Sequence, residues 1–198
     1  MEKLLHEKFL LKGARAVRLL QFAKLFLCEA VRPDDTLVDF TMGNGHDTLY
    51  LCGLVPEGKV YAFDVQKEAI ENTAALLKGA GRDNATLIHD GHQNVKNYVT
   101  GPIGGGMFNL GYRPGGDKTK HTLCETTLTA VKAGVELLRP GGVLVISVYP
   151  GHAEGTREGE ELLSLFSGFD RKQYFVMCHR LINAADAPFI IVCEKYDK

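Results

Sequence analysis

The amino-acid sequence predicts an α/β fold with a seven-stranded, mostly parallel sheet, one antiparallel edge strand and helices on both faces. Short apolar segments rich in β-branched residues alternate with amphipathic segments, the order expected when helical crossovers join parallel strands. The last two strand segments have no helix between them and should therefore pair antiparallel. The 198 residues contain no linker or low-complexity tract, so a single domain over residues 1–198 is expected.

The first predicted helix lies in a basic N-terminal segment. Residues 19–30 carry apolar side chains at intervals of three and four, which predicts a helix that packs on the sheet and ends before Pro33. Lysine and arginine outnumber glutamate across residues 1–32, although the net charge of the chain is −1. Such a segment either faces RNA or is a solvated helix face, and the second interpretation is favoured.

The first strand and its turn span residues 36–50. Residues 37–40 are largely apolar and predict a buried strand, and Gly43 and Gly45 predict a tight turn into a helix that Asp47 or Thr48 can cap. Such a turn presents backbone N–H groups to a nucleotide or dinucleotide. The same glycines also suit a plain strand-to-helix turn, so this segment alone leaves both interpretations open.

Asp64 decides between these interpretations. A second buried strand is predicted at residues 59–64, and its final carboxylate lies about 20 residues after the glycine turn, the spacing typical of a ribose-binding acid. Turn and carboxylate together favour a nucleoside cofactor.

The later elements follow from the same patterns. Asp90 ends a strand on the rim of the glycine turn, because the carboxyl ends of parallel strands meet there. Gly104, Gly105 and Gly106 fall where a central strand usually carries Val or Ile, which indicates a closely packed helix or a shortened strand. Strands are predicted at 85–89, 103–111, 143–149, 173–181 and 188–195, helices at 66–80, 122–138 and 158–166, and turns or loops at 90–93 and 139–142.

Other residue types exclude several classes of protein. The five cysteines are odd in number and never in CxxC spacing, which indicates reduced thiols rather than disulfides or a zinc site. His89 and His92 lack an evident third ligand, so no metal site is expected. No apolar run approaches the roughly 18 residues of a membrane span, and the first residues lack the apolar region of a signal peptide. A cytoplasmic protein is expected.

Five segments of the chain together resemble the class I S-adenosylmethionine-dependent methyltransferases, whose fold is Rossmann-like. These segments are residues 38–45, 63–64, 90, 109–112 and 138–142. Thr41 stands where the usual pattern has its first glycine. A more specific similarity is to the MnmM (YtqB-like) family, and it rests on residues 41–48, 109–118 and 148–155. Its members methylate the aminomethyl group of 5-aminomethyluridine, with or without 2-thiolation, at wobble position 34 of tRNA. The resemblance covers roughly residues 16–195.

The resemblance implies S-adenosyl-L-methionine as cofactor, the tRNA anticodon stem-loop as partner, and a homodimer. The implied cofactor residues lie at the ends of three neighbouring strands. The methionine moiety and its ammonium group would lie at the first turn, the ribose at the second strand and the adenine at the third. These residues are Asp39, Thr41, Gly43, Asn44, Gly45, Asp47, Thr48, Asp64, Gln66, Asp90, Gly91 and His92.

The acceptor side is implied by residues 109–112, which have the spacing of the Asn-Pro-Pro-Tyr motif of amino methyltransferases. Asn109 and Tyr112 would act on the target nitrogen. His152 is a candidate base or relay, or a loop histidine that only hydrogen-bonds Glu154. The predicted substrate-binding residues are Arg113, Asp117 and Lys118, which otherwise form only a charged loop. The alternatives for function are methylation of rRNA or a small molecule, and a noncatalytic nucleoside-binding module.

Overall fold

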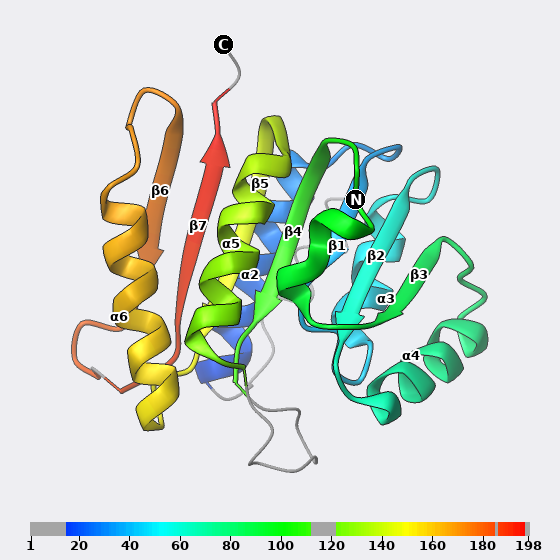
Figure 1. The fold of residues 1–198 in the computed structure, drawn as a ribbon, viewed down its shortest axis with the longest axis horizontal. Coiled ribbons are helices and arrows are strands. Elements are labelled where there is room, and N and C mark those ends of the chain that lie inside the picture. Colours follow the sequence, from blue (N-terminus) through cyan, green and yellow to red (C-terminus); the bar gives the residue numbers. More distant parts are fainter. Residues whose placement is uncertain (1–14, 112–121, 185, 197–198) are drawn as a thin grey trace.

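The computed structural model describes residues 15–111, 122–184 and 186–196, with side chains from residue 21. A seven-stranded sheet in the order β3-β2-β1-β4-β5-β7-β6 forms its centre, with α5 and α6 in front and α2 behind in Figure 1. The elements are α2 (Arg15–Ala30), β1 (Thr36–Asp39), α3 (His46–Leu54), β2 (Lys59–Asp64), α4 (Lys67–Gly79), β3 (Ala85–His89), η1 (His92–Asn97), β4 (Ile103–Asn109), α5 (Cys124–Leu137), β5 (Leu138–Val148), α6 (Ala153–Ser167), β6 (Tyr174–His179) and β7 (Phe189–Lys195).

The sheet confirms the predicted class and strand number. Strands β1 to β5 pair parallel, and β7 pairs antiparallel with both β5 and β6. The antiparallel pairing of the last two strands is therefore as predicted. The reversed strand is β7, which lies one place in from the edge, and β6 at the edge runs parallel to the other strands. The crossover through α6 leaves a place beside β5, which the returning chain fills.

Helices cover both faces of the sheet, as predicted. One apolar cluster joins α2, α3 and α4 to the sheet through side chains that include Leu27, Leu51 and Leu77. The other joins η1, α5 and α6 to the opposite face through Val95, Val131 and Leu162. The functional rim lies between these layers, at the carboxyl ends of the parallel strands.

The three glycines of β4 mark close packing rather than a shortened strand. A Cβ on Gly105 would lie 2.8 Å from Leu27 Cδ2 of α2, and one on Gly106 would lie 2.8 Å from Phe40. The strand nevertheless runs the full length from Ile103 to Asn109. Neighbouring side chains therefore occupy the space that strand side chains would fill, and the first of the two predicted alternatives is correct.

The largest differences from the predicted elements concern three segments. Residues 139–142 belong to β5 instead of forming a turn, and residues 92–93, predicted as part of a loop, begin the 3-10 helix η1. Helix α6 begins at Ala153, five residues before the predicted start. Gly155 lowers helix propensity there, but a Cβ on it would lie 2.1 Å from the Tyr149 carbonyl oxygen, so only glycine fits this close approach.

An ion pair connects the link after α2 to the start of β5. Arg139 Nε and Nη2 donate to the two carboxylate oxygens of Asp35 at 2.8 and 2.6 Å, and Nη2 also donates to the Ala30 carbonyl. The side chains are only 13% and 9% exposed. Burial alone would raise the pKa of Asp35, but the hydrogen bonds and charge of Arg139, with those of Arg32, lower it. A Cβ on Gly104 would overlap this carboxylate.

Candidate active site

A cavity of about 1330 Å³ lies at the carboxyl ends of the parallel strands, where open α/β sheets bind ligands. The structure brings most of the predicted site residues to its wall. Those lining it are Thr41, Gly43, Asn44, Asp47, Asp64, Gln66, Asp90, Gly91, His92, Asn109 and His152. Asp39, Gly45 and Thr48 lie outside this lining, and Tyr112, Arg113, Asp117 and Lys118 lie outside the described residues.

Asp64 joins two of the predicted cofactor segments. Its Oδ2 accepts a hydrogen bond from Gly43 N at 2.9 Å, and its Oδ1 accepts one from Gln66 N at 2.9 Å. Gly43 and Gly45 have φ values of 54° and 81°, the left-handed region that favours glycine. The turn after β1 and the loop after β2 are therefore held together by one carboxylate on the cavity wall.

Asp39 supports this turn from behind the wall. Its side chain is 1% exposed and accepts hydrogen bonds from Thr48 Oγ1 at 2.7 Å and from Thr41 N at 3.1 Å. Burial, reinforced by the charges of Asp47 and Asp64, raises the pKa of Asp39 to about 7. The observed contacts of Asp39 hold the start of α3 against the end of β1.

The loop after β3 forms the opposite end of the cavity. Asp90 accepts hydrogen bonds from Asn94 Nδ2 and Tyr98 OH, both at 2.9 Å, and these bonds lower its pKa. His92 is 9% exposed, and burial lowers its pKa. Its Nδ1 lies 3.0 Å from the Phe40 carbonyl oxygen, which can only accept, so Nδ1 carries the proton of the neutral ring. The loop after β3 therefore places two hydrogen-bonded polar side chains, Asp90 and His92, at this end of the cavity.

Asn109 lies where β4 reaches the cavity. Its backbone N–H donates to Thr41 Oγ1 at 2.7 Å, and its side-chain Nδ2 donates to Asp47 Oδ2 at 3.3 Å. The threonine that replaces a glycine of the usual pattern thus anchors Asn109. Lys24 Nζ lies 2.7 Å from the other oxygen of Asp47. The sequence did not predict Lys24 as a site residue, because only the packing of α2 brings it to the cavity.

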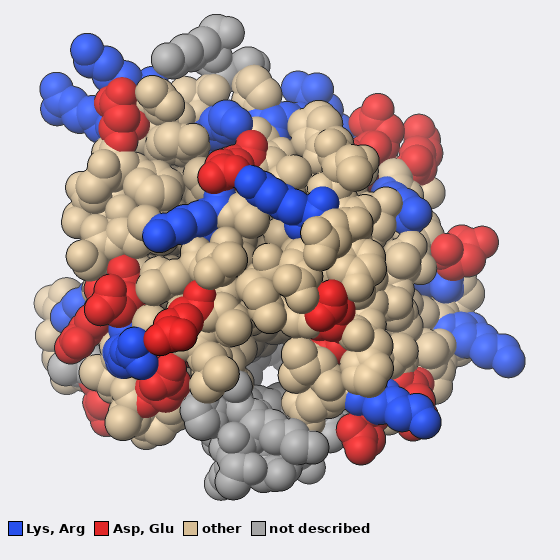
Figure 2. Space-filling view, viewed as in Figure 1, with Lys and Arg blue, Asp and Glu red and all other residues tan. Residues whose placement is uncertain are grey.

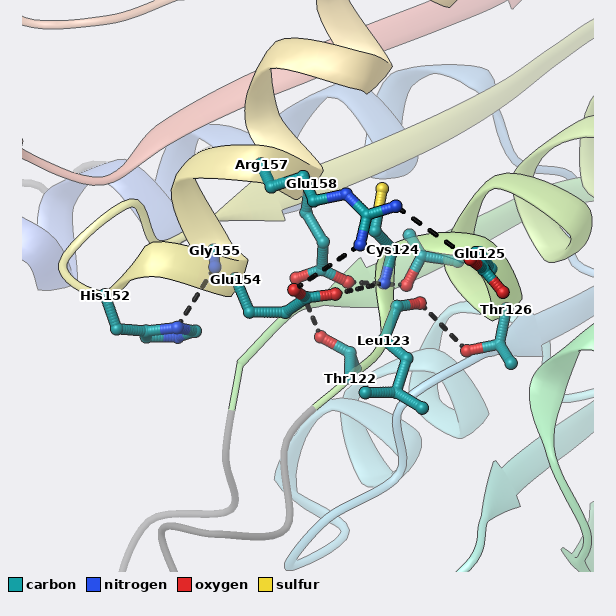
Figure 3. Close-up of polar contacts among 11 residues, drawn as sticks. Thr122, Leu123, Cys124, Glu125, Thr126, His152, Glu154, Gly155, Arg157 and Glu158 are labelled. Carbon is teal, nitrogen blue, oxygen red and sulfur yellow. Dashed lines mark hydrogen bonds and ion pairs between the residues drawn. The ribbon is translucent and has the colours of Figure 1, made fainter.

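Glu158 of α6 holds the segment before α5 through Thr122 (Figure 3). It is 1% exposed and accepts hydrogen bonds from Thr127 Oγ1 at 2.6 Å and Thr122 Oγ1 at 2.9 Å. Thr122 Oγ1 in turn accepts from Gly111 N at 3.0 Å. Burial raises the pKa of Glu158. The end of the β4 exit and the approach to α5 are therefore joined through one buried carboxylate.

His152 caps α6 in the structure. Its Nδ1 accepts a hydrogen bond from Gly155 N at 3.0 Å, whereas Glu154 Oε1 accepts from Cys124 N at 2.9 Å (Figure 3). Because Nδ1 accepts, the neutral ring carries its proton on Nε2. The imidazole borders the cavity with a fixed tautomer, and its role as base or relay stays a prediction.

Replacing His152 separates the capping role from proton transfer. We expect His152→Ala to lower the free energy of unfolding by about 1 kcal/mol through loss of the cap, and His152→Asn to retain most of it. Urea denaturation measures both. A wild-type single-turnover rate of His152→Asn across pH would assign the histidine to the cap alone, and a loss of rate with full stability would support the base or relay.

In the part of the chain that the structure describes, the surface charges and the possible metal ligands do not indicate a further site. Figure 2 shows Lys, Arg, Asp and Glu interspersed over the face seen in Figure 1, so no patch of one sign covers that face. Among the described residues, no group of three or more His, Cys, Asp or Glu side chains could hold a metal ion. Within the same ranges, the helices are too short or too polar to cross a membrane.

Comparisons with known proteins identify the family of this chain. Residues 60–195, more than half of the chain, match the model of a family described as "Putative rRNA methylase". The chain belongs to this methylase family. It is also 35% identical over 179 residues to a chloroplastic tRNA (mnm(5)s(2)U34)-methyltransferase of Arabidopsis thaliana. That match covers 84% of this chain and 65% of the relative, so the chain spans less than two thirds of the relative's length. The family resemblance seen in the motifs is confirmed.

Solved structures show the same methylase fold. A Clostridium thermocellum protein described as an rRNA methylase is 39% identical with a TM-score of 0.87, and the match covers 89% of this chain and 97% of that one. A Streptococcus mutans protein in complex with SAH is 38% identical with a TM-score of 0.83 and the same coverages. The predicted Rossmann-like methyltransferase fold is confirmed.

Proposed function

We propose that this protein is an S-adenosylmethionine-dependent N-methyltransferase that methylates the amine of 5-aminomethyluridine, or its 2-thio form, at tRNA position 34. The observation that carries the proposal is the position of Asn109 in the same cavity as Asp64 and Asp90. The Arabidopsis relative, which is named for tRNA U34, supports the choice of acceptor. The SAH complex of the Streptococcus mutans relative supports the cofactor.

The residues of the wall fit the proposed cofactor. Gly43 and Asn44 are the proposed contacts of the methionine moiety, Asp64 and Gln66 of the ribose, and the loop from Asp90 to His92 of the adenine. S-adenosylmethionine supplies a methyl group on a sulfonium, which is an activated electrophile. Partly exposed amides and carboxylates at fixed positions suit a nucleoside with several hydroxyl and amino donors.

The proposed chemistry is an in-line displacement. The cationic amine first loses a proton, which frees the nitrogen lone pair. The nitrogen then forms a bond to the methyl carbon while the carbon–sulfur bond breaks with its electron pair going to sulfur, and the positive charge passes to the methylated amine. The side-chain oxygen of Asn109 accepts an N–H of the amine and so directs the nitrogen lone pair. Tyr112 is proposed to assist Asn109 at the target nitrogen, and His152 to accept or relay the proton.

The remaining acceptor contacts belong to the same proposal. Arg113 and Lys118 would contact anticodon phosphates, and Asp117 would pair with the cationic amine before it loses its proton.

A cytoplasmic homodimer is also proposed. Cell fractionation and light scattering of the purified protein test location and assembly separately from activity.

Removing the Asp64 carboxylate is expected to weaken cofactor binding about tenfold to a hundredfold. The charged hydrogen bonds that would be lost are each worth about 1.5–3 kcal/mol, and the Gly43 and Gln66 amides also lose their acceptor. Calorimetry of Asp64→Ala with S-adenosylmethionine measures the change. Glu71→Ala on the exposed face of α4 is the control, since it removes the same charge away from the cavity. Unchanged affinity in Asp64→Ala would refute the ribose assignment.

The acceptor is tested on tRNA from cells that lack the gene. Purified protein and S-adenosylmethionine should convert 5-aminomethyluridine or its 2-thio form in that tRNA to the methylaminomethyl nucleoside, as measured by mass spectrometry of nucleosides. Unchanged 5-methylaminomethyluridine in cells without the gene would reject the proposal. Methyl transfer to rRNA or a small amine would favour a different acceptor, and cofactor binding without any transfer would favour a regulatory module.

A further inference from the structure

Within the part of the chain that the structure describes, one hydrogen bond holds the side-chain amide of Asn109. Its Nδ2 faces Asp47 Oδ2 at 3.3 Å, while its backbone N–H is fixed by Thr41 Oγ1 at 2.7 Å. Asp47 lies in the first turn of α3, and its other oxygen meets Lys24 of α2 at 2.7 Å. Asp47 therefore links Lys24 of α2 to the Asn109 carboxamide at the end of β4.

We infer that Asp47 and Lys24 are positioning residues, which fix the end of the Asn109 carboxamide that faces the methyl acceptor. This inference rests on the proposed function. A carboxylate only accepts hydrogen bonds, so it selects the NH₂ end of the amide and turns the carbonyl oxygen away from itself. A neutral amide in place of Asp47 could pair with either end. The charge of Asp47 therefore sets an orientation that the shape of Asn109 alone leaves open.

Lys24 holds Asp47 in the required rotamer. The ammonium is paired with one carboxylate oxygen, which leaves the other directed at Asn109. Lys24 Nζ also lies 4.7 Å from the centre of the Tyr50 ring, and Tyr50 OH donates to the Lys24 carbonyl at 2.9 Å. The Lys24 and Asp47 side chains are 28% and 17% exposed, so the ion pair is partly shielded from water.

The orientation matters because the two ends of the amide have opposite effects on an amine. The carbonyl oxygen accepts an N–H and leaves the lone pair of the nitrogen directed at the methyl group. The NH₂ end would donate to that lone pair and block the attack. Thr41 and Asp47, predicted from the motif as cofactor contacts, thereby act on the acceptor side through Asn109.

The test compares Asp47→Asn, Lys24→Met and Lys24→Arg in single-turnover methyl transfer to tRNA with saturating S-adenosylmethionine. We expect Asp47→Asn to lower the rate about tenfold to a hundredfold, as expected for loss of one oriented hydrogen bond to a charged group. Cofactor affinity from calorimetry and KM for tRNA should stay within about twofold. Lys24→Met should lose less rate, Lys24→Arg should restore it, and the double variant Lys24→Met/Asp47→Asn should be no slower than Asp47→Asn.

Lys96 and Glu136 provide the matched control, because they form an exposed ion pair away from the cavity. Lys96→Met and Glu136→Gln should leave the rate unchanged. A wild-type rate in Asp47→Asn overturns the inference. So does a loss of cofactor affinity that parallels the loss of rate, which would place Asp47 on the cofactor wall. A raised KM for tRNA with unchanged rate in Lys24→Met would assign Lys24 to a phosphate contact and overturn its positioning role.

Nuclear magnetic resonance gives a reading that does not depend on methyl transfer. The side-chain ¹⁵N–¹H signals of Asn109, identified by their absence in Asn109→Ala, should shift in Asp47→Asn and in Lys24→Met but not in Lys96→Met. Unmoved signals overturn the inference even if the enzyme is active. Shifted signals in a protein that does not methylate tRNA support the positioning and reject only the proposed acceptor.

Discussion

Asn109→Ala is expected to lower the rate of methyl transfer about 10²- to 10³-fold while leaving the affinity for S-adenosylmethionine unchanged. Losing one preorganised group that acts on the reacting centre has this magnitude in other enzymes. The Asp64 and Asp90 contacts do not involve the Asn109 side chain, so the cofactor wall should remain intact. Single-turnover kinetics and calorimetry on the same preparation measure both quantities.

The matched control for this variant is Asn97→Ala, since Asn97 is an exposed amide at the end of η1. It should be indistinguishable from wild type in rate and affinity. If Asn109→Ala also loses cofactor affinity, Asn109 belongs to the cofactor wall instead. If its rate is unchanged, the assignment of Asn109 to the target amine is incorrect.

The largest expected effect on stability comes from Arg139. Arg139→Met should lower the free energy of unfolding by about 3 kcal/mol, because it leaves a largely shielded carboxylate without its charged partner. The Asp35 side chain is only 9% exposed, and the Ala30 carbonyl loses a donor as well. Urea denaturation with an unchanged m-value measures the effect.

Two comparisons make this prediction specific. Lys96→Met breaks an exposed ion pair and should cost less than about 1 kcal/mol, and Asp35→Asn combined with Arg139→Met should recover part of the loss.

The pKa of Asp35 is lowered in the folded state, so its stabilising contribution is full above about pH 4 and is lost as pH falls through the folded-state pKa. The difference between wild type and Arg139→Met should shrink in that acidic range. An equal cost for Arg139→Met and Lys96→Met would contradict the assigned role.

The arrangement of the glycine turn and Asp64 on the cavity wall could be predicted from the sequence because its signals are local. The strand, the glycine turn and Asp64 lie within one strand-helix-strand unit, whose geometry places the turn and the carboxylate on one rim. Asp64 accepts a hydrogen bond from Gly43 N, so the turn and the carboxylate do meet on one rim. Most of the strands were recognisable for the same reason, since short apolar segments bounded by turn residues describe buried strands.

The features that sequence reasoning missed depend on packing between distant segments. Lys24 is one lysine among several in a basic helix, and no spacing connects it to Asp47. The sequence predicts too late a start for α6, because histidine is an unusual cap and Gly155 disfavours a helix. The structure needs glycine there, close to the Tyr149 carbonyl oxygen. Helix propensity describes a residue in isolation, whereas here the contact between Gly155 and the Tyr149 carbonyl determines which residue fits.

The packing of α2 on the bare backbone of β4 has a dynamic consequence. Lys24 pairs with Asp47, and Leu27, about one turn further along α2, packs against Gly105. A transient opening of α2 would separate that ion pair without disturbing a single strand of the sheet. Hydrogen exchange of the α2 amides and thermal inactivation of methyl transfer would then follow the same opening free energy, below that of global unfolding.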